Sequence, residues 1–150
     1  MFKRFYNAFL SSLMVMLGFE SCNNLIDAPS EYGTPHVDYK VIGTVTDTAG
    51  NPIPGIKVSV KHQYGKELSD TVDSVYTDAK GAYETKVLSS VFVGDRHTLV
   101  FEDVDGPKNG SFASDTVNIS RLNKQQVKKG SGWDQGFYNV DGSITLKPAE

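Results

Sequence analysis

Oxygen-bearing side chains gather in the segment "DVDGPKNGSFASD", which holds Asp103, Asp105, Asn109 and Asp115. Carboxylate and amide oxygens are the ligands that Ca²⁺ prefers in proteins. The spacing differs from that of an EF-hand loop, because a glycine directly follows the second aspartate. Asp, Asn and Gly are also the residues that exposed turns require. We therefore interpret the segment as a turn and keep a calcium site at these four residues as the alternative.

The remaining groups that could do chemistry do not have catalytic spacing. The three histidines, His36, His62 and His97, are far apart in the chain, and no H-E-x-x-H motif occurs. No G-x-S-x-G motif marks a nucleophilic serine. The sequence therefore predicts a protein that is not an enzyme, with no catalytic residue, no firm metal ligand and no cofactor.

Three aromatic residues lie close together in "GSGWDQGFYNV", namely Trp133, Phe137 and Tyr138. Large aromatic side chains most often fill a core, and the flanking glycines would let the backbone fold the rings inward. We therefore expect Trp133 to be a buried plug at an open end of the domain. The alternative is an exposed aromatic platform that binds a sugar or a peptide.

The beginning of the chain has the pattern of a secretory signal peptide. Lys3 and Arg4 precede a largely apolar run at positions 5–19. That run is shorter than the roughly 20 apolar residues that a membrane-spanning helix needs. A cationic start followed by a short apolar core is typical of export signals. The predicted organisation is a signal peptide at 1–21, a lipid-anchored tether at 22–37 and one folded domain at 38–150.

The single cysteine, Cys22, is the predicted lipid anchor. An exported protein with one cysteine cannot form an internal disulfide, so the thiol requires another role. The stretch "GFESC" resembles the lipobox of bacterial lipoproteins, with Ser21 in the small position. Phe19 and Glu20 depart from the strict pattern. The resemblance implies acyl chains on Cys22, and these would attach the chain stably to a membrane.

Charge excludes one class of partner. The formal net charge is −3, and the lysines and arginines form no basic stripe. Nucleic-acid binding requires such a stripe, so no nucleic-acid partner is expected. Attraction of the whole chain to anionic lipid is not expected either, which leaves the lipid on Cys22 as the means of membrane attachment.

The rest of the chain has the pattern of short strands separated by turns. "IKVSVKH" alternates apolar residues at 56, 58 and 60 with polar residues between them. "YKVIGTVTD" alternates in the same way, and "TAGNPIPG" and "TDAKG" carry dense turn residues. "RLNKQQVKK" has only weak helical character. The predicted fold class is an all-β antiparallel sandwich.

Two segments carry a family resemblance. "VIGTVTDTAGNPIPGIKVSV" and "SVYTDAKGAYETKV" resemble the carboxypeptidase regulatory-like domain over residues 40–88. The matching positions are Gly43, Val45, Asp47, Gly50, Pro52, Gly55, Val58, Val60, Thr77, Asp78, Gly81 and Tyr83. The resemblance implies a transthyretin-like (immunoglobulin-like) sandwich of about seven strands. Tyr83 is expected to bury its ring at a sheet corner and to bond its hydroxyl to the backbone.

The second half of the chain is longer than in an ordinary regulatory-like domain. Together with the leader, the stretches "YGTPHVDYKVIGTVTD" and "DVDGPKNG" make the chain similar to the radical-SAM-associated lipoproteins of Gram-negative bacteria. The expected function is a non-enzymatic interaction module of the cell envelope, with an envelope protein as partner and the outer membrane as location. The alternatives are a lipoprotein that binds a glycan or peptide, and a substrate or partner of a neighbouring radical-SAM enzyme.

Overall fold

The structure, a computed structural model, describes residues 33–149. The predicted signal peptide, Cys22 and most of the predicted tether lie outside the described residues. Residues 33–150 form a compact unit of their own. The first strand begins at His36, two residues before the domain start that we predicted. Among residues 33–149 we find no helix with the length and apolar character that crossing a membrane requires.

The described residues are almost entirely strand, as predicted. The elements in chain order are β1 (His36–Thr46), β2 (Ile56–Tyr64), β3 (Glu67–Tyr76), β4 (Ala82–Glu84), β5 (Leu88–Ser90), β6 (His97–Asp103), β7 (Asp115–Asn118), the 3-10 turn η1 (Ile119–Arg121), β8 (Lys124–Ser131), β9 (Asp134–Asp141) and β10 (Ile144–Thr145). The weakly helical stretch "RLNKQQVKK" therefore forms most of strand β8 instead.

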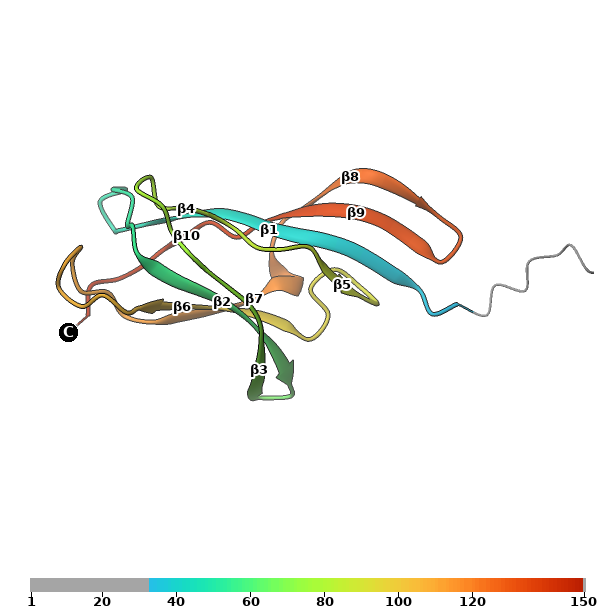
Figure 1. The fold of residues 1–150 in the computed structure, drawn as a ribbon, viewed down its shortest axis with the longest axis horizontal. Coiled ribbons are helices and arrows are strands. Elements are labelled where there is room, and N and C mark those ends of the chain that lie inside the picture. The colour runs from blue at the N-terminus through green and yellow to red at the C-terminus, as the bar shows by residue number, and fades with distance from the viewer. Residues whose placement is uncertain (1–32, 150) are drawn as a thin grey trace, which may run out of the picture. The chain divides into compact units, whose positions relative to one another are not determined.

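The strands form two sheets (Figure 1). One sheet has the order β3-β2-β6-β7, and all its pairs are antiparallel. In the other sheet β1 is central: β4 and β5 pair with one of its edges, β9 and β10 pair with the other, and β8 lies outside β9. The all-β sandwich is confirmed. The antiparallel prediction needs one correction, because β1 pairs in parallel with β9 and β10.

Alternation along the strands fills the core as expected. Val41 and Val45 on β1 and Val58 and Val60 on β2 are fully buried. Phe101 on β6 lies between the sheets as well, and its ring packs edge-on against the ring of Tyr83. The inward faces of both sheets therefore meet in one hydrophobic core.

Turn chemistry fixes the register of the first two strands. Gly50 and Gly55 both adopt left-handed backbone, with φ of 86° and 81°. One carboxylate oxygen of Asp47 accepts hydrogen bonds from the N–H groups of Ala49 and Asn51, each at 2.8 Å. The side chain of Asn51 also donates to Asp47, and this bond holds the pKa of the Asp47 carboxyl below its usual range.

The expected corner tyrosine is confirmed. The ring of Tyr83 is buried, and its hydroxyl donates to the carbonyl oxygen of Gly142 at 2.7 Å. This bond connects β4 to the β9–β10 junction, two segments that are about sixty residues apart in the chain. The bond therefore helps to place β9 beside β1.

Val45→Ala and Val58→Ala are each expected to lower the free energy of unfolding by about 1–3 kcal/mol, because each removes methyl groups from a fully buried site. Thr46→Ala and Lys57→Ala, on the opposite faces of the same strands, are expected to change it by no more than about 0.5 kcal/mol. Urea unfolding of the four variants measures the difference. Equal losses on the two faces would contradict the register.

Candidate binding surface

The three predicted aromatic residues do not form one cluster. Trp133 and Gly132 are the two-residue turn of the β8–β9 hairpin, flanked by the paired residues Ser131 and Asp134. The hairpin places Trp133 at its tip, away from the core, and the residue is 41% exposed. The expectation of a buried plug is therefore wrong. Phe137 and Tyr138 are successive strand residues, so they lie on opposite faces of β9, and Tyr138 packs against the core.

The outer face of the β1–β9 sheet brings together polar residues that are distant in sequence. Val41 pairs with Val140, and both are buried, so the residues on either side of them point outward. Those outward neighbours are Lys40 beside Asn139 and Ile42 beside Asp141. Gln125 of β8 pairs with Asn139 from the other side.

These outward side chains border a groove with a cavity volume of about 560 Å³. Its walls come from four strands and two loops. The lining residues are Ile42, Gly43, Thr44, Ala82, Asn123, Lys124, Gln125, Asn139, Val140, Asp141 and Ser143. We call this site the outer-face groove. Most of its side chains can donate or accept a hydrogen bond, and Ile42 supplies an apolar wall.

Three side chains give the outer-face groove a defined polar character. The Ser143 hydroxyl and N–H hold the pKa of the Asp141 carboxyl below its usual range, so Asp141 presents a stable negative charge. The side-chain oxygen of Asn139 is buried and accepts no hydrogen bond from the described residues. Lys124, from β8, adds a positive charge to the same lining.

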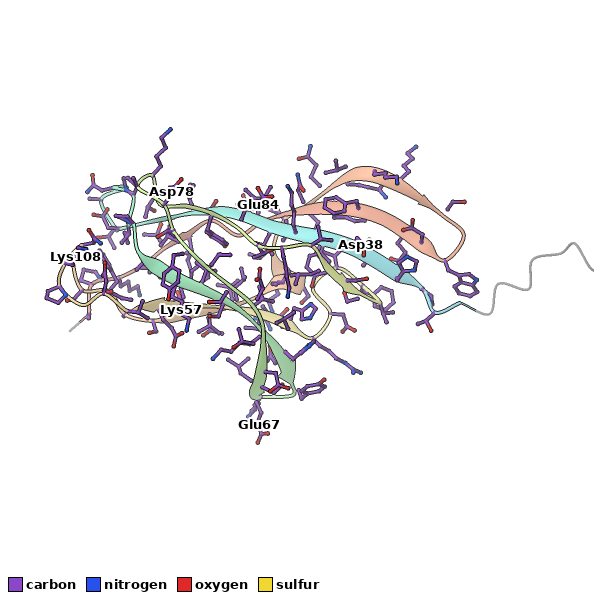
Figure 2. All side chains as sticks on the ribbon, in the orientation of Figure 1. Asp38, Lys57, Glu67, Asp78, Glu84 and Lys108 are labelled. Atoms are coloured by element: carbon purple, nitrogen blue, oxygen red, sulfur yellow. The ribbon has the colours of Figure 1, made fainter. Side chains whose placement is uncertain are left out.

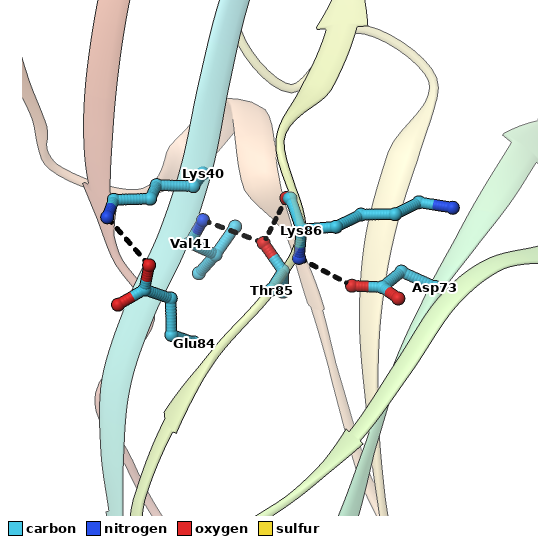
Figure 3. A network of polar contacts seen from close by, with 6 residues as sticks. All are labelled: Lys40, Val41, Asp73, Glu84, Thr85 and Lys86. Atoms are coloured by element: carbon cyan, nitrogen blue, oxygen red, sulfur yellow. Dashed lines mark hydrogen bonds and ion pairs between the residues drawn. The ribbon is translucent and has the colours of Figure 1, made fainter.

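Ion pairing and hydrogen bonds fix the strands that border the groove. Lys40 Nζ lies 2.6 Å from Glu84 Oε1, which joins β1 to β4 on the outer face (Figure 3). Behind this pair the N–H of Val41 donates to Thr85 Oγ1 at 3.0 Å, and the N–H of Lys86 donates to Asp73 at 2.8 Å. The second contact connects the chain after β4 to β3 of the opposite sheet. Contacts within its own sheet and with the opposite sheet therefore hold the strands that border the groove.

A smaller hollow lies on the same face nearer the β8–β9 turn. Its cavity volume is about 310 Å³, and its lining residues are Asp38, Val127, Lys128, Asp134, Gly136 and Phe137. Figure 2 labels Asp38 on β1 and Glu84 on the neighbouring strand β4, with Lys57 and Glu67 on the other sheet. Phe137, one of the three predicted aromatic residues, therefore lines this smaller hollow.

The oxygen-bearing segment at 103–115 is spread over two strands and a loop. Asp103 lies opposite Ile56 in β2, and Asp115 lies opposite Phe101 in β6. The Asp103 carboxylate accepts the N–H of Phe112 at 2.9 Å, and Asp105 accepts the side-chain amide of Asn109 at 2.6 Å. Within residues 33–149, no three His, Cys, Asp or Glu side chains lie close enough to hold a metal ion. Both hydrogen bonds join residues of this same segment, so they stabilise its own loop conformation.

Strand pairing brings two of the three histidines together, the half-buried His62 and the buried His97. His62 of β2 pairs with His97 of β6, and their ring centroids are 4.8 Å apart. The Tyr39 hydroxyl is hydrogen-bonded to Nδ1 of His97, and both residues are almost completely buried. Burial raises the pKa of Tyr39 to about 12. Only strand pairing joins positions 62 and 97, so no local sequence signal could reveal the contact.

Acidification is expected to destabilise the domain through His97. Burial, followed by repulsion from His62, lowers the pKa of His97 below 6.5, although Asp95 acts in the opposite direction. Below pH 6.5 the unfolded chain therefore binds a proton at this position more readily than the folded chain does. Stability should fall as the pH is lowered from 7.5 towards 5.5.

Urea unfolding at a series of pH values measures this effect. The His97→Gln variant keeps a hydrogen-bond acceptor for Tyr39 but does not titrate, so its stability should change less over the same range. An unchanged pH dependence in the variant would contradict the role given to His97.

Comparison with known proteins supports the domain assignment. The family model of the carboxypeptidase regulatory-like domain matches residues 40–105, so this domain is present in the chain. The match extends beyond the residues 40–88 on which the sequence resemblance rested. No curated protein is similar enough to the chain to count as a match.

Several solved structures are similar to the chain. A dioxygenase domain from Streptomyces sp. SirexAA-E is 15% identical with a TM-score of 0.45, and the match covers 79% of this chain and 84% of that one. Catechol 1,2-dioxygenase from Pseudomonas arvilla C-1 is 14% identical with a TM-score of 0.48; the match covers 80% of this chain and 55% of the enzyme. The major plantain pollen allergen is 12% identical with a TM-score of 0.42, covering 74% and 94%.

These matches correct one prediction. The sequence predicts a protein that is not an enzyme, but dioxygenases are among the proteins that match, so that prediction is contradicted and withdrawn. The TM-scores are below 0.5 and the identities are below 25%, so we carry no activity and no residue role from these structures to this chain.

Proposed function

We propose that this chain is an exported, lipid-anchored interaction module of the bacterial cell envelope, which binds a protein partner through the outer-face groove. The observation that carries the proposal is the groove itself. Its polar side chains converge from β1, β8 and β9, and an apolar wall at Ile42 borders them. A concave site in which an apolar wall is combined with polar groups held in fixed positions is typical of recognition sites. The carboxypeptidase regulatory-like domain supplies a rigid support for it.

Export and anchoring rest on the sequence. The leader at 1–21 has the order of a signal peptide, and "GFESC" resembles a lipobox. The similarity to radical-SAM-associated lipoproteins favours an envelope protein encoded near such an enzyme as the partner. The outer membrane is the proposed location.

The anchor is tested with Cys22→Ser. The variant should leave the membrane fraction, and metabolic labelling with a fatty acid should mark the native chain but not the variant. Leu68→Ser, on exposed strand β3 of the opposite sheet, is the control for a change elsewhere on the surface. A Cys22→Ser chain that still sediments with membranes, together with an unlabelled native chain, would refute the anchor.

The groove is tested by photo-crosslinking in cells. A photoreactive residue placed at Gln125, which lines the groove, should give a discrete crosslinked product. The same residue at Glu67, on the edge strand of the opposite sheet, is the matched control. Crosslinking should weaken when Asp141→Asn removes the negative charge of the groove. Equal products from Gln125 and Glu67 would contradict a specific partner in the groove.

The polar lining also favours a second candidate function, which is binding of a glycan. Asn139, Gln125 and Asp141 offer amide and carboxylate groups of the kind that bind sugar hydroxyls, and Phe137 lies on the same face. Titration with envelope glycans, followed through the spectra of labelled amide side chains, would decide between the candidates. Saturable shifts at Asn139 and Gln125 would favour the glycan.

A further inference from the structure

We propose that the tip of the β8–β9 hairpin, together with the loop after β5, is a lipid-contacting end of the domain that rests on the membrane surface. The residues that make the contact are Trp133 and Phe92. The inference rests on the proposed function, because it requires the chain to be held at a membrane through Cys22. It names a second partner, the lipid surface, in addition to the protein that would occupy the outer-face groove.

The first support is the exposure of large aromatic side chains at this end. Trp133 is 41% exposed and Phe92 is 63% exposed. Tryptophan is the residue that membrane proteins place most consistently at the lipid–water interface, because its ring is apolar while its N–H can bond to water or headgroups. Val127, which is 58% exposed, lies on strand β8 of the same hairpin.

The second support is that both aromatic residues lie beside the start of β1. His36 pairs with Asp134, and its N–H donates to the carbonyl oxygen of Trp133 at 3.0 Å. On the other edge of β1, Val37 pairs with Ser90, two residues before Phe92. The Gln135 side chain donates to the Val91 carbonyl at 3.0 Å and so joins the two sides. Figure 1 shows the β8–β9 turn and β5 near this end of β1.

The third support is the point at which the described chain begins. A Cβ added to Gly33 would lie 3.2 Å from the Trp133 ring, so the backbone at Gly33 passes directly against the indole. Ten residues lie between Cys22 and Gly33, so the eleven steps from one to the other can span at most about 40 Å. A bilayer that holds Cys22 therefore cannot be far from Trp133.

The opposite end of the domain is less well placed. Strand β1 has 11 residues, which gives it a length of about 36 Å. The turns at Gly50 and Gly81 lie beyond its far end, beside Val45. The Trp133 end therefore lies closer than the opposite end to Gly33, from which the chain leads back to Cys22, and it is the end that the anchor favours for lipid contact. The anchor keeps the effective concentration of lipid high, so that a contact too weak to bind a free domain can still form.

Trp133 is the only tryptophan and Cys22 the only cysteine, which makes the contact measurable. The chain from Cys22 onward retains the whole compact unit at 33–150. Its single thiol can be coupled to a maleimide lipid in vesicles of phosphatidylethanolamine and phosphatidylglycerol. Coupling should shift the Trp133 emission to shorter wavelength, reduce its quenching by aqueous acrylamide, and make it sensitive to lipids brominated in the acyl chain near the headgroup.

The matched control moves the reporter to the other end of the domain. The control is the double variant Trp133→Phe/Tyr76→Trp, in which the only tryptophan stands at position 76. Tyr76 is 60% exposed, and the N–H of the next residue, Thr77, donates to the carbonyl oxygen of Ile56 at the start of β2. Acrylamide should quench its emission equally before and after coupling, and the brominated lipids should not quench it. Phe92→Ser should reduce the effect of brominated lipid on Trp133.

The outcomes separate this inference from the anchor. If coupled Trp133 stays as accessible to acrylamide as the control tryptophan, the lipid contact is refuted, whatever the native lipidation. If native Cys22 carries no fatty acid but coupled Trp133 still responds to brominated lipid, the native anchor fails, while the capacity of the Trp133 end to contact lipid when the chain is held at a membrane stands. An emission shift that also appears without vesicles and grows with protein concentration would mean that a second copy covers Trp133, and would overturn the inference.

Discussion

The Tyr39→Ala variant is expected to lose about 3–5 kcal/mol of the free energy of unfolding, as large aromatic truncations in a core do. Tyr39, in the first half of β1, is completely buried, and its hydroxyl is hydrogen-bonded to the buried ring of His97. The substitution removes the ring from the core and also leaves His97 Nδ1 without its partner. Urea unfolding monitored by circular dichroism measures the loss.

Tyr39→Phe separates the two contributions. It keeps the ring and removes only the hydroxyl, so its cost should be about 1–3 kcal/mol, the penalty for an unpaired buried polar group. The two variants together therefore test both the packing and the hydrogen bond. A Tyr39→Ala chain that is as stable as Tyr39→Phe would contradict the position of the ring in the core.

Gly136→Ala is the second change for which a large effect is expected. Gly136 has a φ of 92°, and an added Cβ would overlap the carbonyl oxygen of Lys128 across the hairpin. The left-handed backbone alone costs about 1–2 kcal/mol for a residue with a side chain, and the overlap adds to it. We expect β8 to separate from β9 and the amide hydrogens of the hairpin to exchange faster.

Gly50→Ala is the matched control for this prediction. Gly50 has a similar φ of 86°, but a Cβ there would meet no atom within 4 Å. Its cost should therefore be limited to the backbone term, and hydrogen exchange in β8 and β9 should not change. If the two glycine variants lose equal stability, the close approach of Gly136 to Lys128 is not what constrains the hairpin.

The first half of the fold could be predicted because its signals are local. Gly50 and Gly55 form the turn, and Val58 and Val60 alternate on the strand that follows it. A turn and its flanking strands are specified by neighbouring residues, so spacing alone indicates them. Tyr83 was placed correctly because the family resemblance covered its segment.

The outer-face groove could not be predicted, because it depends on pairing between distant segments. Lys40 and Asn139 become neighbours only when β9 aligns in parallel with β1 across almost a hundred residues. No local pattern encodes that register. Trp133 was misplaced for a related reason. The flanking glycines indicated a bend, but they serve a two-residue hairpin turn that carries the ring away from the core.

Lysine labelling in intact cells shows directly whether a partner occupies the outer-face groove. Lys124 lines the groove, whereas Lys66 lies in the exposed turn between β2 and β3. A small amine-reactive reagent should label both residues in the purified domain. In cells we expect the partner to protect Lys124 from the reagent, while Lys66 is labelled as it is in the purified domain. Equal labelling of Lys124 in cells and in the purified domain would contradict a partner in the groove.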